Sequence, residues 1–342
     1  MTLLEPAPAT AIDDQKLFQH RQSAHCESGV VSNLLTHHGV AMSEPMAFGL
    51  SSSLTFAYLP FLKMAGMPMI AYRMMPGSII RGVEKRLKMK WERRQFSNPA
   101  EGKAALDRKI DEGRPVGLQT CVYWLPYFPE DMRFHFNMHN LVAFAREGDE
   151  YIISDPVFED VRRCDSASLE KARFAKGELE AKGMMYEPTQ IPSEIDYAEA
   201  IPKAIRWNSK TMKAPVPIAG IKGIRFLGQN IRKLAKSNQR DKFLPLYLGH
   251  IVRMQEEIGT GGGGFRFIYA SFLQESSKLL NSAVLREAAT AMTDAGDEWR
   301  RFALHATKMC RGRAKMDADE LDAIINRCAD KEQYAWKVME AV

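Results

Sequence analysis

The stretch that decides the fold is residues 25–39, HCESGVVSNLLTHHG, which places a cysteine at the start of an amphipathic helix. Val30, Leu34 and Leu35 recur at helical spacing and predict a buried face, and a glycine closes the stretch as a helix stop. A thiol in the first turn lies against the positive end of the helix dipole, near unpaired N–H groups, and both favour the thiolate. Because the thiolate is the nucleophilic form, Cys26 is the candidate nucleophile.

A histidine that can serve as its base comes much later in the chain. The apolar run 141–145 predicts a buried strand, a turn follows at 147–150, and Tyr151 begins a return strand. With the turn near residues 148–149, His139 and Asp155 fall at the same open end of this hairpin although they are 16 residues apart (155 − 139). A carboxylate beside a histidine fixes its tautomer and stabilises the imidazolium, so these two residues complete a candidate triad.

The order of a cysteine on a helix start followed by a histidine and an aspartate on a later hairpin is that of papain-like enzymes. Each residue also has an ordinary structural interpretation, because single cysteines and histidines often serve only packing. Cys121 is a rival nucleophile, but a thiol in the middle of a strand lacks the helix dipole. His135 is a rival base, but it precedes the apolar run by too much for the hairpin to position it.

Several segments resemble one known family. The segment 25–35, followed by 43–50 (SEPMAFGL), is similar to the amino-terminal domain of the butirosin biosynthesis protein H family, and His139-Asn140 with Ser154-Asp155-Pro156 fits the same pattern. That pattern is also similar to the C39-type papain-like peptidases. The run 261–266 (GGGGFR) resembles the helical domain that accompanies the first domain in this family. The resemblance covers nearly the whole chain after about residue 19.

The resemblance implies an acyltransferase that moves an acyl group from an acyl carrier protein thioester to an amine acceptor. It implies catalytic roles for Cys26, His139 and Asp155 and a cytoplasmic biosynthetic enzyme without a cofactor or metal of its own, since phosphopantetheine arrives on the carrier. Papain-like enzymes often use a glutamine ahead of the cysteine in the oxyanion hole. Three candidates stand at such positions, and the sequence does not choose among them: Gln19, His20 and Gln22.

Size and composition agree with an intracellular enzyme. The chain has 342 residues, of which 45% are hydrophobic and 26% charged, which is ordinary for a globular protein with room for two modest domains. Its five cysteines are scattered without a C-x-x-C pair, which argues against a disulfide framework and a structural zinc site. We see no signal peptide and no membrane-spanning run, and we therefore expect a cytoplasmic protein without a membrane partner.

We expect an α+β protein with a papain-like first domain and a mostly antiparallel sheet, followed by an all-α domain. The expected divisions are a flexible arm at 1–18, a catalytic domain at 19–160 and a helical domain at 161–342. The first domain should contain a loop at 39–53, a strand at 66–72, helices at 78–88 and 99–113, and a strand at 115–122. After a charged helix at 165–182 and a linker at 188–192, helices are expected at 194–209, 224–238, 241–258, 265–280, 282–310 and 317–340.

Further residues are candidates for substrate binding. Tyr123 and Trp124 lie in an aromatic segment ahead of His139, which predicts either a packed loop or a wall of the acyl pocket. The glycine run 259–264 is either a flexible connection or a surface of close approach, where the start of the next helix would hold an anionic group through Gly262 and Arg266. It lacks the Gly-Lys-Ser/Thr of a phosphate loop. Gln22, His25 and Asn140 flank the candidate triad and complete the set.

Basic residues concentrate between positions 203 and 242, and the net charge of the chain is +5. The pattern is that of a surface for an acidic partner, and acyl carrier proteins are acidic. A nucleic acid is the competing partner, but the segment lacks a nucleic-acid-binding motif, and a solvated face without a partner is the third interpretation. Alternative functions are a C39-like peptidase or amidase, a thioester hydrolase and a non-catalytic binding module. A homo-oligomer remains open.

Overall fold

The computed structural model describes residues 18–64, 66–237 and 241–342. Helices and strands mix in the first half, and helices fill the second, so the α+β class is confirmed. Most of the predicted arm at 1–18 and the end of the helix predicted at 224–238 lie outside the described residues. The elements of the first half are α1 (Cys26–His37), α2 (Glu44–Leu50), β1 (Leu54–Met64), β2 (Met67–Arg73), α3 (Ser78–Arg86), β3 (Lys90–Arg94), α4 (Pro99–Asp111), β4 (Val116–Thr120), β5 (His139–Glu147), β6 (Glu150–Ser154), β7 (Arg162–Asp165), α5 (Ser166–Phe174) and β8 (Met185–Gln190).

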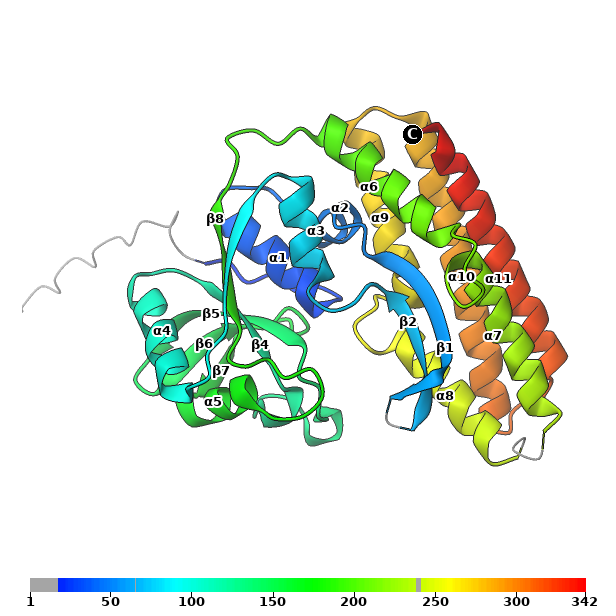
Figure 1. Cartoon of the computed structure of the whole chain (residues 1–342), viewed down its shortest axis with the longest axis horizontal. Helices are drawn as coiled ribbons and strands as arrows, with labels where there is room; N and C mark the ends of the chain where they lie inside the picture. The colour runs from blue at the N-terminus through cyan, green and yellow to red at the C-terminus, as the bar shows by residue number, and fades with distance from the viewer. Residues whose placement is uncertain (1–17, 65, 238–240) are drawn as a thin grey trace, which may run out of the picture.

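Six strands form one fully antiparallel sheet in the order β3-β8-β4-β5-β6-β7. Helix α1 packs on one face and α4 and α5 pack on the other (Figure 1). Residues of β5 alternate between the two faces, so Val142 joins the core around α1 whereas Leu141 and Ala143 join the core around α4. A helix-borne cysteine packed on an antiparallel sheet is the papain-like arrangement.

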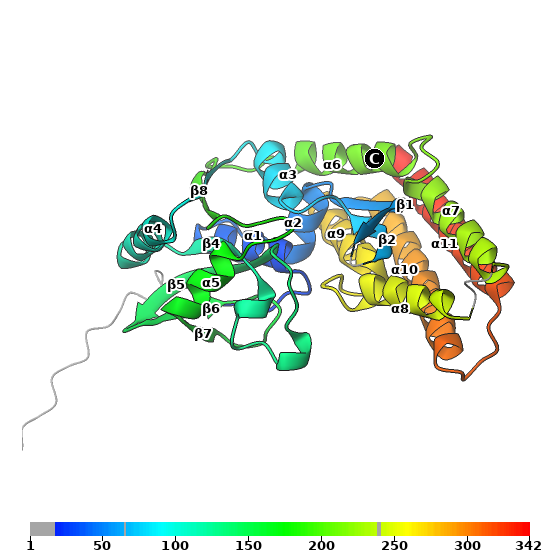
Figure 2. The ribbon, with the colours of Figure 1, turned by 60° about the horizontal axis from the view of Figure 1, so that its bottom comes forward.

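Helices make up the second half, as predicted. They are α6 (Tyr197–Met212), α7 (Gly220–Ala235), α8 (Phe243–Glu256), α9 (Arg266–Leu279), α10 (Ala283–Cys310) and α11 (Ala318–Val338). The long helices α7, α10 and α11 run side by side at the end of the molecule away from the sheet, with α10 against α11 and α11 against α7 (Figures 1 and 2). One continuous core reaches from α1 through the β1–β2 hairpin into these helices, so the two halves share buried side chains.

Several sequence-based expectations were wrong. The predicted loop at 39–53 contains α2. Ser43 caps this helix through its side chain, and Pro45 lies in its first turn, where a proline is favourable. The charged helix at 165–182 ends at Phe174. Residues 188–190 of the predicted linker at 188–192 belong to strand β8, which lies between β3 and β4 as the second strand from the edge of the sheet. The division at residue 160 stays a prediction, and strands from both sides of that position share the sheet.

Not every large apolar residue of the helical half belongs to the core. Leu246 and Leu304 are exposed, at 63% and 53%, because each lies on the outer face of its helix, whereas Leu244, Leu248 and Phe302 are buried. The helical spacing was correct, but the sequence pattern did not show which face of a long amphipathic helix meets its neighbours.

Candidate active site

Cys26 is the first residue of α1, as the sequence predicts. His25 caps this helix: its Nδ1 accepts hydrogen bonds from the N–H groups of Glu27 (3.0 Å) and Ser28 (3.4 Å). The leucines and valines of α1 are buried against the sheet and hold the helix in place. The thiol is half-buried at the positive end of the helix.

His139 begins β5 and Asp155 directly follows β6, so the hairpin brings them together. His139 Nε2 lies 2.7 Å from Asp155 Oδ2, and both side chains are buried. The hairpin register pairs Val142 with Ser154 and Glu147 with Glu150, which places the turn at residues 148–149 as predicted. With Nε2 on the carboxylate, the other ring nitrogen remains for the Cys26 thiol, and the two groups shift each other's pKa.

Electrostatics favour a charged Cys26–His139 pair. Burial opposes ionisation of the thiol, but the hydrogen bond and the charge of His139, with the main-chain N–H of Asn140, lower the pKa of Cys26 below its ordinary value. Burial also opposes protonation of His139, but the charge and the hydrogen bond of Asp155, with those of Cys26, raise its pKa to about 10. Both shifts favour the pair of a thiolate and an imidazolium over the neutral pair.

Asp155 is fixed by more than His139. Its Oδ2 also accepts a hydrogen bond from the Tyr127 hydroxyl at 2.9 Å, and its Oδ1 accepts one from the N–H of Val157 at 3.2 Å. Burial and the Asp155 charge raise the pKa of Tyr127 well above its usual range, which keeps the phenol a donor. Sequence reasoning missed Tyr127, although it lies in the aromatic segment from which Tyr123 and Trp124 were chosen.

Asn140 lies at the thiol. It follows His139 on β5 and points to the face that α1 covers, the face it shares with Val142. Its Nδ2 is 3.8 Å from Cys26 Sγ and donates to the carbonyl of Met138 at 3.0 Å, while its Oδ1 accepts from the Tyr186 hydroxyl at 2.8 Å. Tyr186 comes from β8, the strand that the sequence did not predict, and was missed for that reason.

A half-buried carboxylate from α2, Glu44, holds the chain just ahead of the thiol. Glu44 accepts hydrogen bonds from the N–H groups of Ala24 (2.8 Å) and His25 (2.7 Å) and from the Ser28 hydroxyl (3.0 Å). Burial raises the pKa of Glu44 in spite of these bonds. Glu44 lies in the family-like segment 43–50, but its role depends on α2, which the sequence does not predict.

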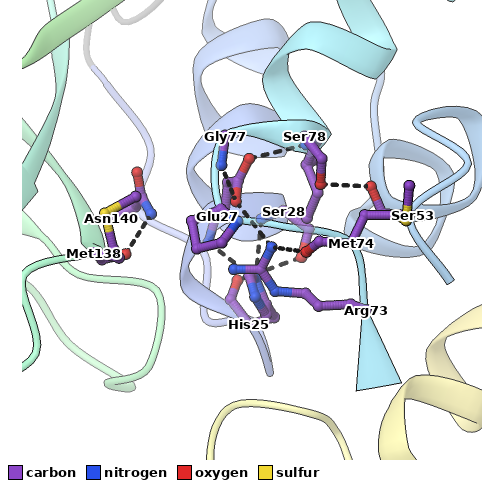
Figure 3. A network of polar contacts seen from close by, with 12 residues as sticks. His25, Glu27, Ser28, Ser53, Arg73, Met74, Gly77, Ser78, Met138 and Asn140 are labelled. Carbon is purple, nitrogen blue, oxygen red and sulfur yellow. Dashed lines mark hydrogen bonds and ion pairs between the residues drawn. The ribbon is translucent and has the colours of Figure 1, made fainter. Parts of the chain in front are cut away.

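A fully buried carboxylate, Glu27, ties α1 to α3 (Figure 3). It accepts hydrogen bonds from the N–H groups of Gly77 (3.0 Å) and Ile79 (2.9 Å) at the start of α3, where the helix dipole favours an anion. Arg73 Nη1 lies 3.3 Å from Glu27 Oε2, the oxygen that also accepts from Gly77, and the charge of Arg73 helps to lower the pKa of Cys26.

The residues ahead of Cys26 differ in role from the expectation. Burial, with the charges of Arg73 and His139, lowers the pKa of His25 well below 6.5, so this residue is a neutral helix cap. His20 binds away from the thiol, with Nδ1 2.7 Å from Ser154 Oγ and Nε2 3.1 Å from the Phe158 carbonyl. Gln19 and Gln22 are exposed, and within the described part of the chain neither makes a hydrogen bond to the site.

Tyr123 and Trp124 are exposed, at 41% and 38%, in a short 3-10 turn at 122–124. The Tyr123 ring stacks on His135 with centroids 4.2 Å apart, and Lys171 lies over the Trp124 ring. His135 is therefore an exposed stacking partner on the surface. A pocket-wall role for the two aromatic residues stays a prediction.

The glycine run lies beside the start of α1. All its glycines have positive φ, and a Cβ at Gly261 would come within 3.3 Å of Ala24 Cβ. Gly262 is buried, and its N–H donates to Thr260 Oγ1 at 3.1 Å. The connection is thus a close-packed loop that reaches the segment carrying the thiol.

Arg266 is fully buried and fully engaged. Its Nε and Nη2 lie 2.9 Å and 3.2 Å from the two carboxylate oxygens of Glu332, and its Nη1 donates to the carbonyl of Gly264 at 2.6 Å. The guanidinium also lies over the rings of Tyr72 and Trp299. These contacts place Arg266 in the core of the helical half, away from solvent.

The other thiols are poor nucleophiles by comparison. Cys121 is fully buried. Burial raises the pKa of Cys164 to about 12, and it raises the pKa values of Cys310 and Cys328. Of the five cysteines, Cys26 is the one whose pKa is lowered.

The basic stretch 203–242 is partly neutralised by acidic residues that lie far away in the sequence. Arg225 pairs with Asp330, Arg232 pairs with Asp319, and Lys213 pairs with Glu340. Lys210, Lys222, Lys233 and Lys236 remain exposed. The free positive charge of this face is therefore smaller than the sequence indicates, and a carrier-protein contact there stays a prediction.

Three further findings concern metal binding, membrane spans and cavities. Within residues 18–64, 66–237 and 241–342, no cluster of histidine, cysteine and carboxylate side chains is suited to holding a metal ion. Among the helices of the same residues, none has the length and apolarity needed to cross a bilayer. A separate cavity of about 380 Å³, between α3 and the start of α6, is lined by other residues, including Arg86, Gln190 and Glu199.

Comparison with known proteins places both halves. Residues 25–156 match the family model described as butirosin biosynthesis protein H, N-terminal, and residues 167–339, just over half of the chain, match that of a domain of unknown function, DUF4872. A crystal structure of a putative C39-like peptidase from Bacillus anthracis is similar over 51% of this chain and 96% of that chain, with 14% identity and a TM-score of 0.36. A likeness at that level supports no functional inference. No curated protein matches.

Proposed function

The chain belongs to the DUF4872 family, and ahead of that domain it carries a papain-like domain of the butirosin biosynthesis protein H, N-terminal, type; on this premise we propose that the protein is an acyltransferase. It takes an acyl group from an acyl carrier protein thioester onto Cys26 and passes it to an amine. The observation that supports this most is the array of a half-buried Cys26 with buried His139 and Asp155, in which the thiol pKa is lowered and the imidazole pKa is raised.

In the first half-reaction the Cys26 thiolate adds to the thioester carbonyl carbon. The bond from that carbon to the phosphopantetheine sulfur then breaks, and the departing thiolate takes the proton of the His139 imidazolium. The products are an acyl-enzyme, a free carrier thiol and a neutral imidazole. Asp155 holds the ring through Nε2 throughout, so the proton is exchanged at the nitrogen that faces the sulfur.

In the second half-reaction an uncharged amine adds to the acyl-enzyme carbonyl and gives its proton to His139. Cys26 leaves as the thiolate, which restores the charged pair. Exchange of one thioester for another is nearly balanced, whereas amide formation is downhill, so the two half-reactions need no nucleotide. The chemistry requires two substrates that visit one thiol in turn.

Intact-mass spectrometry of the protein incubated with an acyl-loaded carrier protein tests this proposal. We expect a mass increase equal to the acyl group on Cys26, its absence in Cys26→Ala and its persistence in Cys310→Ser. Addition of an amine should discharge the adduct with formation of an amide. An adduct that survives in Cys26→Ala, or one that discharges to the free acid at the same rate with and without amine, would overturn the transferase and favour another nucleophile or a hydrolase.

A further inference from the structure

The Asn140 side chain lies at the sulfur with its amide orientation fixed. The residue is fully buried, and its Oδ1 accepts the Tyr186 hydroxyl hydrogen at 2.8 Å. A phenol hydroxyl that donates to Oδ1 assigns the oxygen and leaves Nδ2 on the side of Cys26, 3.8 Å from Sγ. Burial raises the pKa of Tyr186 well above its usual range, so the phenol remains a donor throughout the working pH range.

One of the two Nδ2 hydrogens is already used. Nδ2 donates to the Met138 carbonyl at 3.0 Å, and that bond sets the plane of the amide (Figure 3). The other hydrogen is directed to the thiol at a distance too long for a strong hydrogen bond to sulfur in its resting state. In a tetrahedral adduct the oxyanion sits one bond beyond the attacked carbon, within reach of a donor at that distance.

The main-chain N–H of Cys26 supplies a second donor. The next N–H groups of α1 are taken: those of Glu27 and Ser28 by His25 Nδ1, and that of Gly29 by the His25 carbonyl. Within the residues that the structure describes, the Cys26 N–H has no acceptor. On the other side, Glu44 accepts from the N–H groups of Ala24 and His25, so the N–H groups that flank that of Cys26 are engaged.

The side chains expected in this role lie elsewhere. Both ring nitrogens of His20 are engaged near Ser154 and Phe158, and Gln19 and Gln22 are exposed. Asn140 is the side-chain amide that lies beside the sulfur in the described residues.

We propose that the Asn140 side-chain amide and the Cys26 N–H form the oxyanion hole, and that Tyr186 is a positioning residue that orients the amide. This rests on the proposed function. When the thiolate adds to the thioester carbonyl, the π electron pair moves onto the carbonyl oxygen, and the two N–H groups stabilise that charge. When the pair returns, the bond to the departing sulfur breaks and the oxygen releases both donors.

Two reactions of the same sulfur separate this role from an effect on the thiol. Alkylation of Cys26 by iodoacetamide forms no oxyanion, whereas acylation by a simple acyl thioester of N-acetylcysteamine does. For Asn140→Ala we expect acylation to slow by about 10²- to 10³-fold. The rate of alkylation and its pH midpoint should stay within twofold of wild type. Tyr186→Phe should show the same split with a smaller loss, and Asn326→Ala, an asparagine on α11 that is bonded to Asp322, should leave both reactions unchanged.

Each result of these two reactions supports or overturns either the oxyanion-hole proposal or the proposed function. Equal losses of acylation and alkylation in Asn140→Ala would assign Asn140 to thiol ionisation or to folding and would overturn the proposal. So would acylation at the wild-type rate. A wild-type protein that is alkylated at Cys26 but not acylated by thioesters would refute the proposed function itself. If Asn140→Ala does not fold, Tyr186→Phe decides the question, because it keeps the amide and removes only its orienting bond.

Discussion

At the scale of single residues, the site depends on transfer of a proton from the Cys26 thiol to the His139 imidazole. Burial alone would oppose the two charges that this transfer creates. Burial works against both the thiolate of Cys26 and the imidazolium of His139, yet each lowers the cost of the other, and Asp155 stabilises the cation. Asp155 accepts three hydrogen bonds, from His139, Tyr127 and Val157, so its charge has a fixed position. The carboxylate is therefore the anchor of the array.

Asp155→Asn should reduce kcat/KM for acyl transfer by about 10²- to 10⁴-fold, because the amide neither fixes the tautomer of His139 nor stabilises its protonated form. It should also lower the pKa of His139 and raise that of Cys26. Acyl-transfer kinetics, with thermal unfolding to verify the fold, measure this effect. A loss below threefold would show that His139 does not depend on the carboxylate.

At the scale of elements, the sequence indicated those parts of the site that follow from local rules. The helix at Cys26, the turn at 148–149 and the meeting of His139 with Asp155 followed from helical spacing and hairpin register. Tyr186 and Glu44 did not, because each lies on an element without a clear local signal: β8 reads as a linker with Pro188, and α2 reads as a serine-rich loop. Their contacts depend on long-range packing, which the pattern does not contain.

Gly264, in the glycine run between α8 and α9, should be a position where a side chain lowers the free energy of unfolding. Gly264 has φ +58°, and a Cβ there would lie 2.3 Å from Tyr72 Cδ1. Gly264→Ala should therefore lower the free energy of unfolding by more than about 1–2 kcal/mol, the cost of the left-handed backbone alone. Chemical denaturation measures the change.

Gly249→Ala is the matched control for Gly264→Ala. Gly249 lies within α8, where a Cβ would meet nothing within 4 Å, so an alanine should raise stability by about 0.5–1 kcal/mol. Equal effects at the two positions would show that Gly264 is not constrained by its backbone and by Tyr72.

At the scale of the whole molecule, the helical half supports the papain-like half through shared packing. The buried pair of Arg266 and Glu332 lies beneath the glycine run, and Glu332 also accepts a hydrogen bond from the Trp299 indole at 2.8 Å. The sequence predicts that Arg266 binds an anionic group of the substrate, because it lies at the start of a helix. In the structure Arg266 instead binds Glu332, which is 66 residues away in the sequence, and no local sequence pattern predicts this pairing.

Arg266→Met should lower the free energy of unfolding by about 3–5 kcal/mol, because it leaves a buried carboxylate without its cation. KM for the acyl donor should not change in the protein that folds. Arg300→Met, which removes an exposed arginine at a loose pair with Glu256, should cost less than about 1 kcal/mol. A rise in KM without a loss of stability would place Arg266 in the substrate site.

The pH dependence of Cys26 alkylation tests the central claim most directly. Because the thiol pKa is lowered, the thiolate is lost at a lower pH than an ordinary thiolate, and an imidazole pKa of about 10 means that its positive partner persists up to that pH. We predict that alkylation of wild-type Cys26 by iodoacetamide has a pH midpoint below the ordinary thiol value and below the midpoint of Cys310. In His139→Ala the midpoint should rise toward the ordinary thiol value. A wild-type midpoint equal to that of Cys310, or one that His139→Ala does not move, would contradict the thiolate–imidazolium pair.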